Sequence, residues 1–346
     1  MKPTTPRSTK AVTLADVAQA AGVSKSTASL ALRDDARVKS ITKDLIRSVA
    51  DKLGYVRDPA MSRFSRYRWE GSRRSRETIV YLAHYPDKKE RYPWLFPAAD
   101  SMARELGYTL EYVELSEYPS PSRLSDMLFH RGVRGVFLAP ILPGSEIPEM
   151  SWSRFSVVAS DEGHADLPFH SVRPNYRSAL RRCWEYLLAQ GCKRPGFALL
   201  QEDLSPKVST LAGEFLFLQE QFLQAEEIVP VLYGKDLDKT DIKVRLNDWI
   251  RLYEPDAIIG FNDAVYWALE SLDWKHLSTH RAFASVMSSE GINSVKITGT
   301  SFPRHLLGGS AIRLLDGMIQ NGEQGIPEYP ARHLVAPEWI NGATES

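Results

Sequence analysis

The chain has little of what stabilises secreted or membrane proteins. Its 346 residues include only two cysteines, Cys183 and Cys192, which indicate packing thiols in a reducing cytoplasm rather than a disulfide framework. No stretch approaches the roughly 18 apolar residues of a membrane span, and the polar first residues lack the apolar segment of a signal peptide. We therefore expect a cytoplasmic globular protein with two or three compact units.

Motifs of catalysis and metal binding are also absent. The sequence contains no GxSxG, no GxxxxGK[ST] and no HExxH. Its eight histidines show no ligand-like spacing, although His276 and His280 lie four residues apart in a polar stretch. These absences favour a protein that is not an enzyme and that needs neither a cofactor nor a metal.

The net charge is zero, but the charges are distributed unevenly. Residues 1–77 hold 17 lysines and arginines against 8 aspartates and glutamates, a net charge of +9. The remaining residues hold 26 against 35, a net charge of −9. A basic head on an acidic body indicates one domain that binds DNA and another that binds something else.

The segment 13–53 predicts three short helices. Thr13 and Asp16 are spaced as a capping box, Gly22 allows a tight turn, and Ser24 caps the second helix. Apolar residues at helical spacing form the three inward faces: Leu14, Val17, Ala18 and Ala21; Ala28, Ala31 and Leu32; Ile46, Val49, Ala50 and Leu53. The alternative is a small scaffold that binds no nucleic acid. The basic outward face of the second helix favours a helix-turn-helix instead.

These residues carry a resemblance to a known family. The segment TLADVAQAAGVSKSTASLALRDDARV, followed by KLGY at 52–55, resembles the DNA-binding headpiece of LacI-family transcription regulators. The resemblance implies a headpiece at 1–56, of which 1–11 is a disordered arm, a basic hinge at 57–77, and a periplasmic-binding-protein-like core at 78–346. It also implies a homodimer that binds a double-stranded, pseudo-palindromic operator, and we expect repression controlled by a small molecule.

The second helix carries the residues that we expect to contact DNA. Lys25, Ser26 and Ser29 should face base edges in the major groove, whereas Thr27 and Arg33 should contact the backbone. Small and basic side chains suit this position because phosphate repels acidic ones.

Two positions depart from the family pattern. Leu30 replaces a frequent arginine and could contact a thymine methyl group. Phe64 occupies the hinge position of the leucine that the family wedges into the minor groove, and the alternative is a flexible basic tether. The candidate DNA contacts are Thr13, Ser24, Lys25, Ser26, Thr27, Ser29, Leu30, Arg33, Tyr55, Met61, Phe64 and Ser65.

From residue 78 onward, strand-like and helix-like segments alternate. Strands are expected at 78–83, 109–115, 135–139, 155–160, 195–200, 228–234, 256–261 and 295–299. This alternation predicts an α/β core of parallel sheets with helices on both faces. Two similar halves agree with the two-lobed core that the resemblance implies. We expect the first lobe at 78–173 plus 298–322, and the second at 174–297 plus 323–346.

Ligands of open α/β sheets bind outside the carboxyl ends of the strands. Asp161 follows one such strand, and Asn262 with Asp263 follows another and matches the family's Asn-Asp pair. Trp94 lies in a YPWL segment at the position of the family's NPFF-like segment, where it could stack on a sugar ring. Thr210 stands where the family often has a ligand-binding arginine, so we expect a carbohydrate rather than a phosphorylated effector.

Each of these assignments has an alternative. Asn262 and Asp263 could cap the following helix, Trp94 could be a core residue, and Asp161 could be a turn residue. The whole chain could also be a solute-binding protein of a transport system, an effector-independent DNA-binding protein, or an enzyme with a fused DNA-binding domain. The headpiece disfavours the first of these functions, and the missing catalytic motifs disfavour the last.

Overall fold

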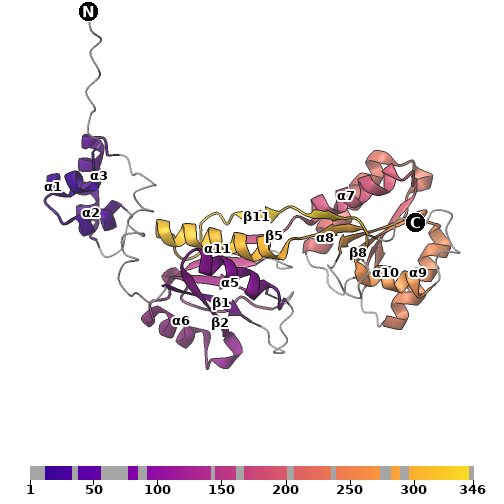
Figure 1. Cartoon of the computed structure of the whole chain (residues 1–346), viewed down its shortest axis with the longest axis horizontal. Coiled ribbons are helices and arrows are strands. Elements are labelled where there is room, and N and C mark those ends of the chain that lie inside the picture. Colours follow the sequence, from indigo (N-terminus) through magenta and orange to yellow (C-terminus); the bar gives the residue numbers. More distant parts are fainter. Residues whose placement is uncertain are drawn as a thin grey trace, which may run out of the picture. The chain divides into compact units, whose positions relative to one another are not determined.

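The computed structural model describes residues 12–32, 38–55, 77–84, 92–141, 145–160, 167–200, 206–234, 239–272, 282–288 and 296–342. These residues form two compact units (Figure 1). The first, a helical unit, consists of residues 1–76 together with 317–323, and the second is a larger α/β unit that contains residues 77–316 and 324–346. No helix of the described part is long and apolar enough to cross a membrane.

The helical unit contains α1 (Leu14–Ala20), α2 (Lys25–Leu32) and α3 (Ser40–Leu53). Their interior consists of Val17, Ala18, Ala28, Ala31, Ile46 and Ala50. The predicted capping box is confirmed, and Gly22 and Gly54 both adopt φ of +67°, which glycine tolerates and other residues avoid. The expectation that Leu53 packs inward is wrong. It is 39% exposed and does not join the headpiece core, whereas Ala50 before it and Tyr55 after it do.

The first sheet of the core has the strand order β11-β5-β4-β3-β1-β2, and neighbouring strands pair in parallel. The strands are β1 (Glu77–Ala83), β2 (Tyr108–Glu114), β3 (Gly135–Leu138), β4 (Ser156–Ser160), β5 (His170–Pro174) and β11 (Arg332–Val335). Its helical segments are α5 (Leu95–Glu105), η1 (Leu115–Glu117), α6 (Pro121–His130) and η2 (Trp152–Arg154). Because strand side chains alternate between faces, Val80 and Leu82 join the core cluster that includes Leu124 of α6. Tyr81 instead contacts Phe96 of α5.

The second sheet has the order β12-β10-β9-β8-β6-β7 and is parallel except for the antiparallel pair β10–β12. Its strands are β6 (Pro195–Leu199), β7 (Leu232–Tyr233), β8 (Ala257–Asn262), β9 (Ala282–Met287), β10 (Gly299–Ser301) and β12 (Glu338–Ile340). The helical segments of this part are α7 (Tyr176–Ala189), α8 (Pro206–Phe222), η3 (Ala225–Glu227), α9 (Lys239–Tyr253) and α10 (Asp263–Glu270). The predicted two-lobed core with parallel sheets is therefore confirmed.

The lobe boundaries around the last helix, α11 (Arg304–Asn321), differ from those expected from the sequence. This helix follows β10 of the second sheet but packs on α5, where a Cβ atom built at Gly308 would lie 2.6 Å from the Ala99 amide nitrogen. The segment 298–322, expected in the first lobe, thus contributes β10 to the second sheet. The segment 323–346, expected in the second lobe, contributes β11 to the first sheet.

The described chain passes between the lobes at three places, and each carries a proline. Pro174 ends β5 just before α7, Pro303 separates β10 from α11, and Pro337 separates β11 from β12. Two of these passages are hydrogen-bonded to structure around them. The Asn175 amide donates to the Val335 carbonyl at 2.8 Å, and the Arg182 side chain donates to the Pro337 carbonyl at 2.8 Å.

Several strand boundaries differ from the sequence-based expectation. The strand expected at 228–234 is reduced to Leu232–Tyr233, because Pro230 has no amide hydrogen to donate to a neighbouring strand. The strand expected at 295–299 begins only at Gly299. The strands β5, β9, β11 and β12 were not predicted.

Candidate DNA-binding face and effector site

The first turn of α2 presents hydroxyl groups and one ammonium group. The Ser24 hydroxyl oxygen accepts the Thr27 amide at 3.1 Å and so caps the helix, as the sequence predicts. The same oxygen lies 2.8 Å from the Ser26 hydroxyl and 2.8 Å from the Thr27 hydroxyl. Lys25 is exposed beside them. The amino-terminal end of the second helix of a helix-turn-helix reads base edges, and these groups can bond to bases or phosphates.

The burial pattern of α2 separates an inner from an outer face. Ala28 and Ala31 are fully buried in the headpiece core, whereas Lys25 and Ser26 are exposed. The other described candidates on this helix, Thr27, Ser29 and Leu30, are partly exposed. Four candidate DNA contacts, Arg33, Met61, Phe64 and Ser65, lie outside the described residues.

Thr13 and Tyr55 take part in the headpiece fold. The Thr13 hydroxyl and amide both lie 2.7 Å from a carboxylate oxygen of Asp16, to which they donate. Tyr55 is half-buried against the headpiece core, and its amide donates to the Ala50 carbonyl at 2.9 Å. Both residues therefore hold the helices in place, and a DNA contact by either remains a prediction.

Asn262 and Asp263 lie where β8 passes into α10. The Asn262 side-chain oxygen accepts the Ala264 amide at 3.1 Å, so Asn262 is the N-cap of α10, which was the alternative interpretation of this residue. Asp263 is the first residue of α10 and is only 8% exposed. A carboxylate at the first turn of a helix is stabilised by the helix dipole. Its position at the carboxyl end of a parallel strand agrees with a ligand site, and its role as a ligand contact stays a prediction.

Trp94 lies immediately before α5 and is partly buried. Its ring meets Tyr92 edge to face with centroids 6.3 Å apart. The Arg304 guanidinium carbon lies 5.8 Å from the Trp94 ring centroid, within cation–π range. Trp94 therefore joins the start of α5 to the start of α11. Asp161, the third candidate that follows a strand, lies outside the described residues.

An ion cluster around the buried Glu214, near Thr210, was not predicted from the sequence. Thr210 is exposed on α8, and Glu214, one helical turn further on, has a side chain only 4% exposed. One Glu214 carboxylate oxygen lies 2.6 Å from Nε of Arg177, and the other pairs with Arg181. The cluster joins α7 to α8. The only signal in the sequence is an acidic residue beside Phe215 in an otherwise apolar stripe.

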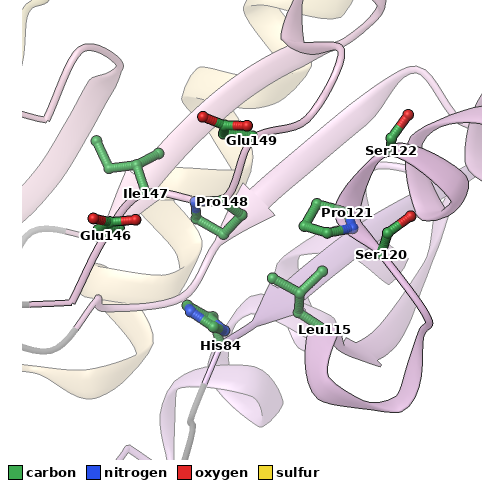
Figure 2. A pocket seen from close by; sticks show the side chains of 9 residues that line it. All are labelled: His84, Leu115, Ser120, Pro121, Ser122, Glu146, Ile147, Pro148 and Glu149. Carbon is green, nitrogen blue, oxygen red and sulfur yellow. The ribbon is translucent and has the colours of Figure 1, made fainter.

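A hollow of about 400 Å³ lies at the carboxyl ends of β1, β2 and β3 (Figure 2). Its lining consists of His84, Leu115, Ser120, Pro121, Ser122, Glu146, Ile147, Pro148 and Glu149. None of the four described effector candidates lines it. Sequence analysis missed these residues because they come from three separate loops that only the parallel sheet brings together.

The two cysteines are buried packing residues, as expected. Burial raises the pKa of the Cys183 thiol to about 12. Burial, and next the nearby Asp256 carboxylate, raise the pKa of the Cys192 thiol to about 11. The Cys183 thiol donates to the Ser285 carbonyl at 3.4 Å. Both thiols stay protonated near neutral pH, which makes them poor nucleophiles.

Comparison with known proteins adds to this geometry. The family model for bacterial regulatory proteins of the lacI family matches residues 13–58. Catabolite control protein A of Staphylococcus xylosus is 27% identical over 256 residues, which cover 73% of this chain and 74% of that protein.

Two solved structures share the fold over almost the whole chain. A complex of the transcriptional regulator CelR with cellobiose has a TM-score of 0.56 at 19% identity and covers 96% of this chain and 99% of its own. The lac repressor dimer bound to operator and the anti-inducer ONPF has a TM-score of 0.53 at 17% identity, with coverages of 97% and 99%. The helix-turn-helix therefore matches the lacI family of bacterial regulatory proteins over residues 13–58, and the two-lobed core behind it shares the fold of these two solved regulators.

Proposed function

We propose that the chain is a homodimeric cytoplasmic repressor that binds a pseudo-palindromic operator and responds to a small molecule bound in its core. The observation that carries the proposal is the first turn of α2, where Lys25 and three linked hydroxyls are presented at the end that reads bases. A dimer brings two such helices to two half-sites one helical turn apart, which is why the operator should be a pseudo-palindrome.

The DNA contacts divide into base readout and backbone positioning. Lys25, Ser26 and Ser29 contact base edges, and Thr27 with Arg33 contacts phosphates. The partly exposed Leu30 contacts a thymine methyl group, since an aliphatic side chain cannot donate to guanine.

The basic hinge at 57–77 supplies a second set of contacts. Met61, Phe64 and Ser65 lie along the minor groove, and Phe64 acts as the wedge between base steps. Because the hinge also carries several arginines, its affinity for phosphates does not depend on Phe64.

The DNA proposal is tested by titrating fragments from upstream of the gene and its neighbours with the full chain, followed by footprinting. Lys25→Ala should weaken binding to the specific site by about 1–3 kcal/mol. The control is Lys52→Ala in the last turn of α3, which removes the same charge from the same domain but not from α2. Equal losses in the two variants, or an asymmetric footprint, would contradict the assignment of α2 as the reading helix.

The effector is a carbohydrate without a phosphate group. Thr210 offers no charge to a phosphate, and the nearby Arg177 and Arg181 already share the Glu214 carboxylate. Asp263, Asn262, Trp94 and Asp161 complete the proposed contacts. A fold relative whose structure is a complex with cellobiose supports a sugar as the ligand class. The ligand must bind the DNA-competent and DNA-incompetent states with different affinity, since otherwise it could not shift the equilibrium between them.

The effector proposal is tested by a thermal-shift screen of mono- and disaccharides, followed by operator titrations with any hit. Asp263→Asn should keep operator affinity without the sugar and lose the response to it. The control is Asp248→Asn, an exposed carboxylate on α9 of the same lobe. If a sugar changes the operator affinity of both variants equally, Asp263 stabilises the start of α10 and does not contact the ligand. If no sugar changes operator affinity, the chain is an effector-independent DNA-binding protein.

A further inference from the structure

Helix α8 carries apolar side chains on both of its faces, although only one face packs against the lobe. The inner face holds Leu211, Phe215 and Leu218, each of which is at most 1% exposed. Leu216 and Phe217 lie on the other side of the helix and are 51% and 49% exposed. A helix that is apolar all round is normally buried on all sides. The outer face of α8 therefore indicates a contact that the single chain does not provide.

The outer face of α8 forms one continuous stripe with a single charge. At 3.6 residues per turn, the stripe covers about 60° of the helix surface on either side of Gly213. Its members are Ser209, Thr210, Gly213, Leu216, Phe217 and Glu220. All six residues are exposed, and only Glu220 is charged. Scattered apolar side chains are normal on a protein surface, whereas adjoining ones on a face almost without charge mark an interaction site.

The lobe holds this outer face in a fixed position. The Glu214 carboxylate, on the side of α8 that faces α7, lies 2.6 Å from Nε of Arg177 and also pairs with Arg181. The buried Gln219 side chain donates to the Val229 carbonyl at 3.0 Å and so fixes the last turns of the helix. Because the helix is already ordered, a partner that binds its outer face loses little free energy to ordering it.

The distribution of side-chain sizes on the outer face fits a second copy of the same face. The amino-terminal half of the stripe carries the small residues Ser209, Thr210 and Gly213. The carboxyl-terminal half carries the bulky residues Leu216, Phe217 and Glu220. In an antiparallel pair of helices that cross at Gly213, the bulky half of each helix covers the small half of the other. A Cβ built at Gly213 meets nothing within 4 Å, so there is room for the second helix at the crossing point.

A parallel pair of the same helices fits less well. It would place Phe217 against Phe217 of the other copy and would bring the two Glu220 carboxylates together, where they repel each other. In the antiparallel pair, each Glu220 lies seven residues from the crossing point. At 1.5 Å per residue, the two carboxylates are then about 20 Å apart. Both size and charge therefore favour the antiparallel arrangement.

We infer that the outer face of α8 is a self-association surface that packs antiparallel on the α8 of a second copy of this chain. One helix face is smaller than the roughly 1,200 Å² that stable interfaces bury, so we expect a weak contact that forms at micromolar concentration. The inference goes beyond the proposed function, because neither operator nor effector binding enters it. If another face forms the proposed homodimer, the α8 contact joins two dimers.

The antiparallel geometry is tested by disulfide cross-linking of the full chain in air with a copper catalyst. Gly213→Cys should link two chains, because the crossing point brings the two Cα atoms within the roughly 7 Å that a disulfide can span. The matched control is Glu220→Cys, which lies on the same face but far from its copy. The buried Cys183 and Cys192 do not compete. Equal linkage of both variants, or no linkage of Gly213→Cys, would overturn the inference.

The contribution of the apolar face is tested by sedimentation velocity over a series of concentrations of the full chain. Phe217→Glu should raise the concentration at which the largest species is half formed by at least about tenfold. The matched control is Phe129→Glu, which changes a phenylalanine of α6 that is 48% exposed in the other lobe. The inference fails if Phe217→Glu and the parent chain show the same distribution of species, or if Phe129→Glu shifts that distribution as strongly. Operator binding is measured separately, so its failure counts against the regulator proposal alone.

Discussion

The headpiece and the core have interiors of different size and chemistry. Four of the six buried apolar residues of the headpiece are alanines, accompanied by Val17 and Ile46. In the core, by contrast, Trp184, Tyr81 and Phe137 are fully buried. Because stabilisation scales with the apolar area removed from water, the headpiece gains far less from its interior than the core does. Caps and turns must therefore supply a larger share of the stability of the headpiece, whereas packing dominates in the core.

The sharpest way to break the packing of the core is to enlarge Gly308. The Gly308→Ala variant places its Cβ 2.6 Å from the Ala99 amide nitrogen, a backbone atom that cannot move aside alone. We expect a loss of about 3 kcal/mol in the free energy of unfolding. Urea unfolding followed by tryptophan fluorescence measures this loss in the core, because residues 12–55 contain no tryptophan.

The matched control is a second helical glycine in the core. A Cβ built at Gly213 of α8 meets nothing within 4 Å, so Gly213→Ala should raise the stability by about 0.5–1 kcal/mol. Opposite signs at the two glycines would confirm that α5 and α11 touch backbone to backbone. If Gly308→Ala leaves the free energy of unfolding unchanged, the backbones of α5 and α11 are not in contact at this position.

A smaller effect should come from a cap in the headpiece. Thr13→Ala removes the hydroxyl of the capping box and should cost about 1 kcal/mol, most of it within the headpiece. Ser40→Ala is the control, because Ser40 begins α3 where no side-chain cap bond forms. Hydrogen exchange of headpiece peptides measures both losses. Similar protection in the two variants would show that caps matter less in the headpiece than its small interior suggests.

The effect that is smallest near neutral pH concerns the cysteines of the core. The thiols have pKa values of about 12 and 11 in the folded chain against an ordinary thiol pKa of 9.0, so only the unfolded chain ionises just above pH 9. Their contribution to stability should be complete below pH 9 and should fall as the pH rises towards 11 and 12. A pH series of urea unfolding with the Cys183→Ala variant isolates the contribution of Cys183. Rapid reaction of the folded chain with a thiol reagent at pH 8 would contradict the burial.

The headpiece could be predicted almost completely because its determinants are local. Thr13 and Asp16 are three residues apart, Ser24 caps the helix that follows it, and Gly22 ends the one before it. Only Leu53 was assigned wrongly, since the helical spacing does not reveal where a small core ends.

The core could not be predicted from the sequence where the interacting residues are far apart along the chain. The strand β5 contains an arginine and a proline, and β11 exposes three of its four residues, so neither shows a strand pattern. Each becomes a strand by pairing with the other, as Arg332 does with Ser171. The cluster around Glu214 and the hollow beside His84 are likewise assembled from separate elements, and spacing along one segment cannot reveal them.

The prolines at the three passages between the lobes have an entropic consequence. Each proline fixes one φ angle near −65°, so the segments that join the lobes have fewer accessible conformations than they would without proline. A ligand that bridges the lobes therefore immobilises little additional backbone. Less of the free energy of its contacts is then lost to ordering the backbone, and more can contribute to a difference in affinity between two states of the core. For the proposed effector, Pro174, Pro303 and Pro337 would thus lower the ordering cost of binding relative to flexible connections.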